Sequence, residues 1–282
     1  MKLKNWIELI GFKGKTNRFG YKIKEFSCDN HLIKYAQWQH PKEKSKVINS
    51  EDIVAYKKFL SEGDFCIDIG AHTGDSTLPI AAAVGKTGLV LAVEPNHYVF
   101  PILQKNCLMN KNKYNIIPIY GAAHKKNEEL IFHYSDKNYC NGGNHNSVNI
   151  FKRGHNFKLS VWGLDLKDLL EQDFSEELKK LSYIKIDTEG NDLYVINSIF
   201  DILTNYRPFI KFEIFKFTTR EYREKLMSVF NKIEYKLFYV EKDPVTVSFE
   251  INIENICKNK HYDVFALPVE KIEMTLDKLQ IK

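Results

Sequence analysis

Residues 65–77 read Phe65-Cys66-Ile67-Asp68-Ile69-Gly70-Ala71-His72-Thr73-Gly74-Asp75-Ser76-Thr77, and this stretch decides the fold. An apolar run typical of a buried strand enters a turn punctuated by glycines, and small residues typical of a helix follow over residues 76–84. The stretch predicts the first strand-turn-helix unit of an α/β nucleotide-binding fold. At such a turn, the glycine backbone and the unpaired N–H groups of the helix start face a polar ligand.

The turn does not match the commonest nucleotide-binding motifs. A dinucleotide fingerprint would have glycines at positions 70, 72 and 75, where this chain has Gly70, His72 and Asp75. The chain also lacks the Gly-Lys-Ser/Thr ending of a phosphate-binding loop. Asp68 stands two positions before the first glycine, and its carboxylate would repel a pyrophosphate but attract an ammonium or a sulfonium. S-Adenosylmethionine carries both of these cations and is the predicted ligand.

A second acidic residue supports this ligand. Residues 88–93 are predicted to form a second buried strand, which ends at Glu94-Pro95-Asn96. The carboxyl ends of neighbouring parallel strands meet at one edge of a sheet, so Glu94 is expected beside the first turn. There its carboxylate can accept hydrogen bonds from both hydroxyls of a ribose; the alternative is a solvated charge at a strand end.

At this point the sequence resembles the FkbM-type methyltransferases, a group of S-adenosylmethionine-dependent enzymes. The resemblance covers roughly residues 64–213. It rests on the first turn and on four further segments, which are Val93-Glu94-Pro95-Asn96, Gly163-Leu164-Asp165-Leu166-Lys167-Asp168-Leu169-Leu170, Ile184-Lys185-Ile186-Asp187-Thr188-Glu189-Gly190, and Arg207-Pro208 followed by Glu213. The chain departs from the family at His72, where Asn is usual, and at Asn191-Asp192, where Ala-Glu is common.

The resemblance implies a three-layer, Rossmann-like class I methyltransferase fold, with a mostly parallel seven-stranded sheet and an antiparallel C-terminal strand. Two predicted strands at residues 235–240 and 262–267 fit an antiparallel pair at one edge of that sheet. The turn at residues 121–123 follows a third strand and would lie near the adenine. The expected cofactor-binding residues are Asp68, Gly70, Ala71, His72, Gly74, Thr77, Glu94, Asn96 and Ala122.

Two acids after the fourth predicted strand are the catalytic candidates. Asp187 is the first choice for orienting the methyl acceptor and taking its proton, and Glu189 is the second. Both could instead only cap the next helix. With Asp192 they could also hold Mg²⁺, but carboxylate spacing alone does not establish a metal site, and none is predicted. Glu213 is expected to pair with Lys185 or Lys211.

The chain is expected to have an N-terminal cap over residues 1–48 and a methyltransferase domain over residues 49–282. In the cap, residues 41–46 are predicted to form a solvated loop. A strand-loop-strand insertion is predicted at about residues 128–166, and its loop at residues 136–156 is interpreted as a lid over the acceptor. His145, Arg153 and His155 are candidate acceptor contacts within it.

Composition limits the other classes of function. The net charge of +5 is spread over 282 residues, which does not indicate nucleic-acid binding. The five cysteines form no C-x-x-C pair, so the sequence predicts neither a zinc site nor a disulfide framework. No signal peptide or membrane-spanning run is evident, and a cytoplasmic protein is expected. The basic segment at residues 2–12 would allow weak peripheral membrane association.

The leading hypothesis is an O-methyltransferase that acts on a hydroxyl, most readily that of a sugar in a glycan or glycosylated small molecule, as the resemblance implies. One alternative is a non-catalytic cofactor-binding or scaffold protein with the same fold. Another is an NAD-dependent oxidoreductase, which His72 and Asp75 disfavour.

Overall fold

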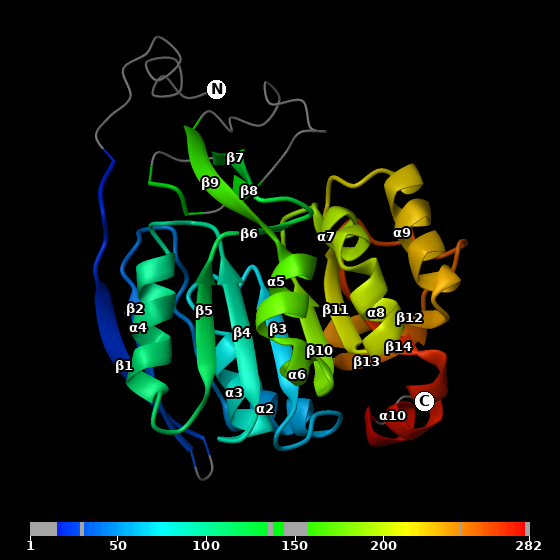
Figure 1. Ribbon diagram of the computed structural model, residues 1–282, viewed down its shortest axis with the longest axis horizontal. Coiled ribbons are helices and arrows are strands. Elements are labelled where there is room, and N and C mark those ends of the chain that lie inside the picture. The colour runs from blue at the N-terminus through cyan, green and yellow to red at the C-terminus, as the bar shows by residue number, and fades with distance from the viewer. Residues whose placement is uncertain are drawn as a thin grey trace.

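The protein is built around a mostly parallel sheet of eight strands, shown in Figure 1. The computed structural model describes residues 16–28, 31–134, 138–140, 142–143, 157–242 and 244–279. The strand order is β13-β12-β14-β11-β10-β3-β4-β5. The parallel strands are β3 (Phe65–Ile69), β4 (Leu89–Glu94), β5 (Ile116–Tyr120), β10 (Leu181–Ile186) and β11 (Phe209–Ile214). The class I α/β fold predicted from the sequence is therefore confirmed.

Helices cover both faces of this sheet and make three layers. One face packs against α5 (Leu166–Asp173), α6 (Ser175–Leu178), α7 (Asp192–Ser198), α8 (Phe200–Tyr206) and α9 (Arg220–Lys232). The other face packs against α2 (Ser50–Lys57), α3 (Thr77–Val84), α4 (Phe100–Asn110) and α10 (Ile272–Leu279), the last of which follows the short 3-10 helix η2 (Val269–Lys271). Because both faces are buried, the central strands are almost wholly apolar.

The edge of the sheet has one more strand than expected. β14 (Tyr262–Pro268) runs antiparallel to β11, and β12 (Tyr235–Lys242) runs antiparallel to β14. These are the two predicted closing strands. β13 (Thr246–Glu250) lies between them in sequence and pairs with β12, which raises the count from seven to eight.

A second, four-stranded sheet lies beyond the carboxyl ends of the parallel strands, at the top of Figure 1. It contains β6 (Ala122–His124), β7 (Glu128–Tyr134), β8 (Gly142–Gly143) and β9 (Phe157–Asp165). The predicted pair of inserted strands corresponds to β7 and β9. The turn expected at residues 121–123 is wrong in part, because Ala122 begins a strand that pairs with β9. Most of the predicted lid, with His145, Arg153 and His155, lies outside the described residues.

Two strands of the N-terminal segment form a hairpin, β1 (Tyr21–Cys28) and β2 (His31–Trp38). Two buried asparagines of α4 bind the backbone of β2. The Asn106 side chain bonds to both the N–H and the C=O of Ala36, and the Asn110 side chain bonds in the same way to Lys34. The hairpin is thereby docked on α4.

The hydrophobic residues of this hairpin also join a core cluster that includes α2 and α3. The basic segment at residues 2–12, which would allow weak membrane association, lies outside the described residues. Within the described ranges, none of the helices combines the length and the apolar character that crossing a membrane requires.

Candidate active site

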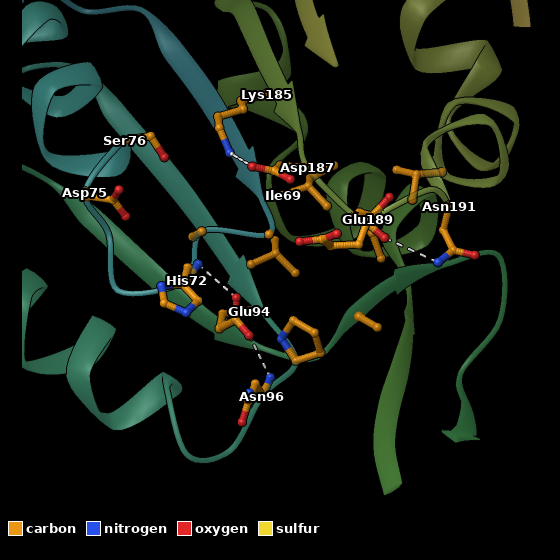
Figure 2. A pocket seen from close by; sticks show the side chains of 18 of the residues that line it. Ile69, His72, Asp75, Ser76, Glu94, Asn96, Lys185, Asp187, Glu189 and Asn191 are labelled. Carbon is orange, nitrogen blue, oxygen red and sulfur yellow. Dashed lines mark hydrogen bonds and ion pairs between the residues drawn. The ribbon is translucent and has the colours of Figure 1, made fainter. Parts of the chain in front are cut away.

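A cavity of about 620 Å³ opens at the carboxyl ends of β3, β4 and β10. This is the edge of an open α/β sheet where ligands bind, and the volume falls in the range of small-molecule sites. Its walls come from residues far apart in the sequence: the loop between β2 and α2, the turn after β3, the end of β4, the second sheet, and the segment after β10. Figure 2 shows the side chains at its centre.

The turn after β3 is held tightly against the end of β10. Gly70 has a φ of 78°, and a Cβ atom at this position would lie 2.0 Å from the carbonyl oxygen of Asp187. Only glycine fits this turn. The N–H groups of Gly70 and Ala71 both donate to the Val93 carbonyl, which fixes the turn to β4 as well. Three adjacent strand ends are thus locked together around the cavity.

His72 is the third turn residue on the cavity wall, and it adopts the left-handed conformation with a φ of 49°. Its side chain is half-buried, and its Nε2 atom is buried without a hydrogen-bond partner among the described residues. Burial lowers the pKa of this imidazole to about 4. The ring is therefore neutral at physiological pH.

Asp68 does not lie where the sequence argument put it. The side chain is fully buried, and Asp68 is not among the residues that line the cavity. Its Oδ2 atom accepts hydrogen bonds from the hydroxyls of Ser76 and Thr77, at 2.8 and 2.7 Å. Gly74 and Thr77 are also absent from the cavity wall. These three residues shape the turn from behind.

Glu94 does reach the cavity, at the end of β4. One carboxylate oxygen accepts the N–H of His72 and the other accepts the N–H of Asn96, both at 2.8 Å. Burial raises the pKa of Glu94 to about 7, against the lowering effect of these two N–H groups. Asn96 and Ala122 also line the cavity. Glu94, Asn96, Ala122 and the first three turn residues are therefore brought together.

Asp187 and Glu189 follow β10 and both line the cavity. The ammonium of Lys185 lies 3.1 Å from Asp187 Oδ2 (Figure 2). It also lies 3.6 Å from Asp68 Oδ1. Partial burial raises the pKa of Asp187, but the charge of Lys185 outweighs it and leaves the pKa below its ordinary value. The pKa of Glu189 is raised by burial and by the charge of Asp187. The two acids thus have opposite shifts.

Asp192 does not line the cavity, unlike these two acids. It is fully buried, and its Oδ2 atom accepts from the Thr188 hydroxyl and the Gly190 N–H. Across the described ranges, no three His, Cys, Asp or Glu side chains are grouped in a way that could hold a metal ion. The pKa of Glu213 is raised to about 9, mainly by burial and next by the charge of Asp187.

The expected pairing of Glu213 with a lysine is wrong. Lys185 pairs with Asp187 and Lys211 pairs with Asp263 at 2.9 Å, while Glu213 lies 3.4 Å from the ring of His261. Strand order explains this, because β14 with Asp263 lies next to β11. Lys185 belongs to the Lys-Ile-Asp-x-Glu-Gly segment, so its position at the site could have been predicted from this motif.

Lys46 and Asp75 form an ion pair in the cavity wall that no pattern in the sequence predicts. Lys46, from the loop before α2, lies 2.7 Å from Asp75 Oδ2 on the turn after β3. The loop at residues 41–46 was predicted to be solvated, because a run of lysines and a proline usually is. No local pattern could have linked residues so far apart along the chain.

Many solved structures are similar to this chain, and three of them share 13% sequence identity with it. The FkbM methyltransferase of Methylobacillus flagellatus matches 75% of this chain with a TM-score of 0.46. The match includes 47% of that protein, so this chain spans about half of its length. The S-adenosylmethionine-dependent O-methyltransferase of Thermotoga maritima has a TM-score of 0.40 and coverages of 88% and 77%. The fibrillarin of Aeropyrum pernix, bound to S-adenosylmethionine, has a TM-score of 0.43 and coverages of 90% and 99%.

No curated protein matches the sequence. A family model does match, that of the methyltransferase FkbM domain, and the match extends over residues 68–264. This range includes the turn after β3, Glu94 and both acids after β10. Because the match covers more than half of the chain, the protein belongs to the FkbM methyltransferase family, a family of S-adenosylmethionine-dependent enzymes.

Proposed function

We propose that the protein transfers a methyl group from S-adenosylmethionine to a hydroxyl, with a sugar of a glycan or of a glycosylated small molecule as the preferred acceptor. The observation that carries the proposal is the cavity at the ends of β3, β4 and β10, where acids from two strand ends face one space. The sugar acceptor rests on the resemblance to the family and on the polar character of the residues after β10.

The residues of the first half of the cavity fit the adenosyl group. Glu94 would accept hydrogen bonds from the ribose hydroxyls, since each of its oxygens has one lone pair left after binding a backbone N–H. The glycine at position 70 brings the backbone of the turn close to a ligand without a side chain between them. Asn96 would face the ribose side, and the small Ala122 would leave room for the adenine ring.

S-Adenosylmethionine supplies an electrophilic methyl group on a sulfonium, so no covalent nucleophile from the protein is needed. The chain's own residues must align the acceptor hydroxyl and remove its proton. Glu189 is the better base of the two candidates, because its pKa is raised. Asp187 would orient the acceptor, since Lys185 keeps it ionised. This reverses the order of the two roles inferred from the sequence.

Ligand binding and methyl transfer test this proposal in sequence. S-Adenosylhomocysteine at about 100 times its Kd should stabilise the protein by about 2.7 kcal/mol, which is a rise in Tm of about 5–10 °C for a chain of this size. NADH should give no shift. Labelled methyl transfer should then be detected on members of a glycan panel. A shift with NADH and none with S-adenosylhomocysteine would indicate the oxidoreductase instead.

Replacing Glu189 separates the enzyme from a scaffold. Glu189→Gln should lower kcat by about 100-fold or more, because general-base catalysis contributes on that scale, while the Kd of S-adenosylmethionine stays the same. Glu171→Gln, an exposed carboxylate on α5, is the matched control and should keep full activity. Cofactor binding by the parent protein without methyl transfer to any hydroxyl would favour the non-catalytic alternative.

A further inference from the structure

We propose that Lys46 and Asp75 form a charge clamp for the amino-acid end of S-adenosylmethionine, in which Asp75 binds the α-ammonium and Lys46 binds the α-carboxylate. The inference rests on the proposed function, and it assigns the part of the ligand that the sequence argument gave to Asp68. It also gives the N-terminal segment a role in cofactor binding.

The two residues meet at the cavity from separate parts of the chain. Lys46 belongs to the loop between β2 and α2, and Asp75 to the turn between β3 and α3. Their charged atoms are 2.7 Å apart, and their side chains are 31% and 28% exposed. Both residues line the cavity, together with Gly70, Ala71 and His72 of the same turn. The pair is therefore only partly covered, and its open side faces the cavity.

The position along the turn suits the methionine part of the ligand. In Figure 2, Asp75 and Ser76 lie on one side of His72 and Glu94 lies on the other. If Glu94 holds the ribose, a ligand that continues over the turn reaches Asp75 next. Asp187 follows the neighbouring strand β10, and the acceptor is proposed to bind there. The pair of Lys185 with Asp187 is therefore less suitable for the amino-acid end of the ligand than the pair of Lys46 with Asp75.

The charges of the clamp are complementary to the ligand. An amino-acid end carries one positive and one negative group at neutral pH, and an ion pair offers one charge of the opposite sign to each. Partial burial raises the pKa of Asp75, but the charge and the hydrogen bond of Lys46 outweigh it, so the carboxylate is ionised. Asp68 cannot take this role, because its side chain is fully buried and Ser76 and Thr77 occupy its Oδ2 atom.

Lys46 also lies outside the residues that the family model matches, which begin at 68. Its place at the cavity depends on the loop that follows β2. In this loop the Lys46 N–H donates to the side chain of Gln37 at 2.7 Å, and that glutamine is itself buried. The backbone under Lys46 is thus fixed to the hairpin.

Three ligands and two variants test the clamp by calorimetry on the full chain. The ligands are S-adenosylmethionine, its decarboxylated form and 5′-methylthioadenosine. Of the two charges of the amino-acid end, the decarboxylated form keeps the ammonium and 5′-methylthioadenosine keeps neither. The variants are Lys46→Met and Asp75→Asn. Lys236→Met is the matched control, because it removes a lysine from an ion pair of the same 2.7 Å length on β12, away from the cavity.

Loss of one charge-assisted contact should weaken binding by about 10- to 100-fold. Lys46→Met should show this loss with S-adenosylmethionine but not with the decarboxylated form. Asp75→Asn should show it with both, and neither variant should change binding of 5′-methylthioadenosine. Lys236→Met should bind all three ligands like the parent.

Two results would overturn the clamp while the proposed function stands. One is a parent protein that binds S-adenosylmethionine normally and variants that bind it equally well. The other is an equal loss for all three ligands in Lys46→Met, which would mean that the pair only holds the loop in place. A parent protein that binds none of the adenosyl ligands would overturn the proposed function first, and the clamp with it.

Discussion

Glu94 is positioned by the protein itself, because each of its carboxylate oxygens accepts one backbone N–H at 2.8 Å. These two bonds leave the side chain with one orientation, toward the cavity. Burial nevertheless raises its pKa to about 7, so near neutral pH about half of the molecules carry a protonated side chain. The cofactor site is thus expected to respond to pH.

The affinity for S-adenosylhomocysteine should depend on pH through Glu94. If ribose hydroxyls donate to the ionised carboxylate, protonation of Glu94 competes with the ligand. Affinity for S-adenosylhomocysteine should therefore be constant above about pH 8 and should fall by up to about tenfold per unit as the pH drops below about 7. Calorimetric titrations across this range measure the slope.

Glu94→Gln provides the comparison for that slope. The amide can accept only one of the two backbone N–H groups, so the other N–H loses its partner. The substitution also removes the negative charge that would face the ribose hydroxyls. Affinity should fall by about 10- to 100-fold and lose its dependence on pH. A variant with the same pH slope as the parent would show that another group titrates.

Among single residues, the sequence was informative where a role depends on local geometry. Gly70 and Glu94 follow from the strand-turn pattern, and both lie where the pattern put them. The direction of Asp68 could not be predicted, because the hydroxyls that bind it, on Ser76 and Thr77, fold back onto it only in the completed turn. Lys46 was missed because its partner is set by tertiary packing alone.

At the scale of elements, side chains of α4 bond to the backbone of β2 in the way that a neighbouring strand would. Asn106 and Asn110 are one helical turn apart and bind Ala36 and Lys34, which are two residues apart on β2. Four helical residues rise about 6 Å and two strand residues about 6.6 Å, so the two spacings match. The side-chain amides therefore satisfy part of the free edge of the hairpin, which would otherwise be open to pairing.

The second prediction follows from this match. Asn106→Ala would leave the Ala36 backbone groups and the Thr73 carbonyl buried without their partner. The free energy of unfolding, measured in urea, should fall by about 2–4 kcal/mol. Asn197→Ala, an exposed amide on α7, should change it by less than about 0.5 kcal/mol.

An equal, small effect of both substitutions would mean that water replaces the bonds of Asn106.

Most of the helices and strands could be predicted from the sequence, because their signals are local. β3, β4 and β5 are apolar runs bounded by turns, and α2 is capped by Asn49, a typical N-cap residue, whose side chain accepts the Asp52 N–H. The strand β6 has only three residues and no pattern of its own, so its pairing with β9 was not predictable.

At the scale of the whole molecule, the loop that follows the N-terminal hairpin and the strand ends of the main sheet share the wall of one cavity. The hairpin is fixed to α4 by the asparagines, and its following loop meets the turn after β3 through Lys46 and Asp75. A ligand that binds this pair would join the two parts more tightly. It should then reduce local opening in both, because binding to the closed form opposes any fluctuation that separates them.

Hydrogen exchange tests this last prediction directly. Saturating S-adenosylhomocysteine should slow amide exchange in residues 39–49 and in residues 70–76 together, by about tenfold or more if the clamp forms. The hairpin of β12 and β13 lies at the far edge of the sheet and should exchange at the same rate with and without ligand. In Lys46→Met the protection of residues 39–49 should be lost while that of residues 70–76 remains. Slower exchange in the turn alone, in the parent protein, would place the N-terminal segment outside the cofactor site.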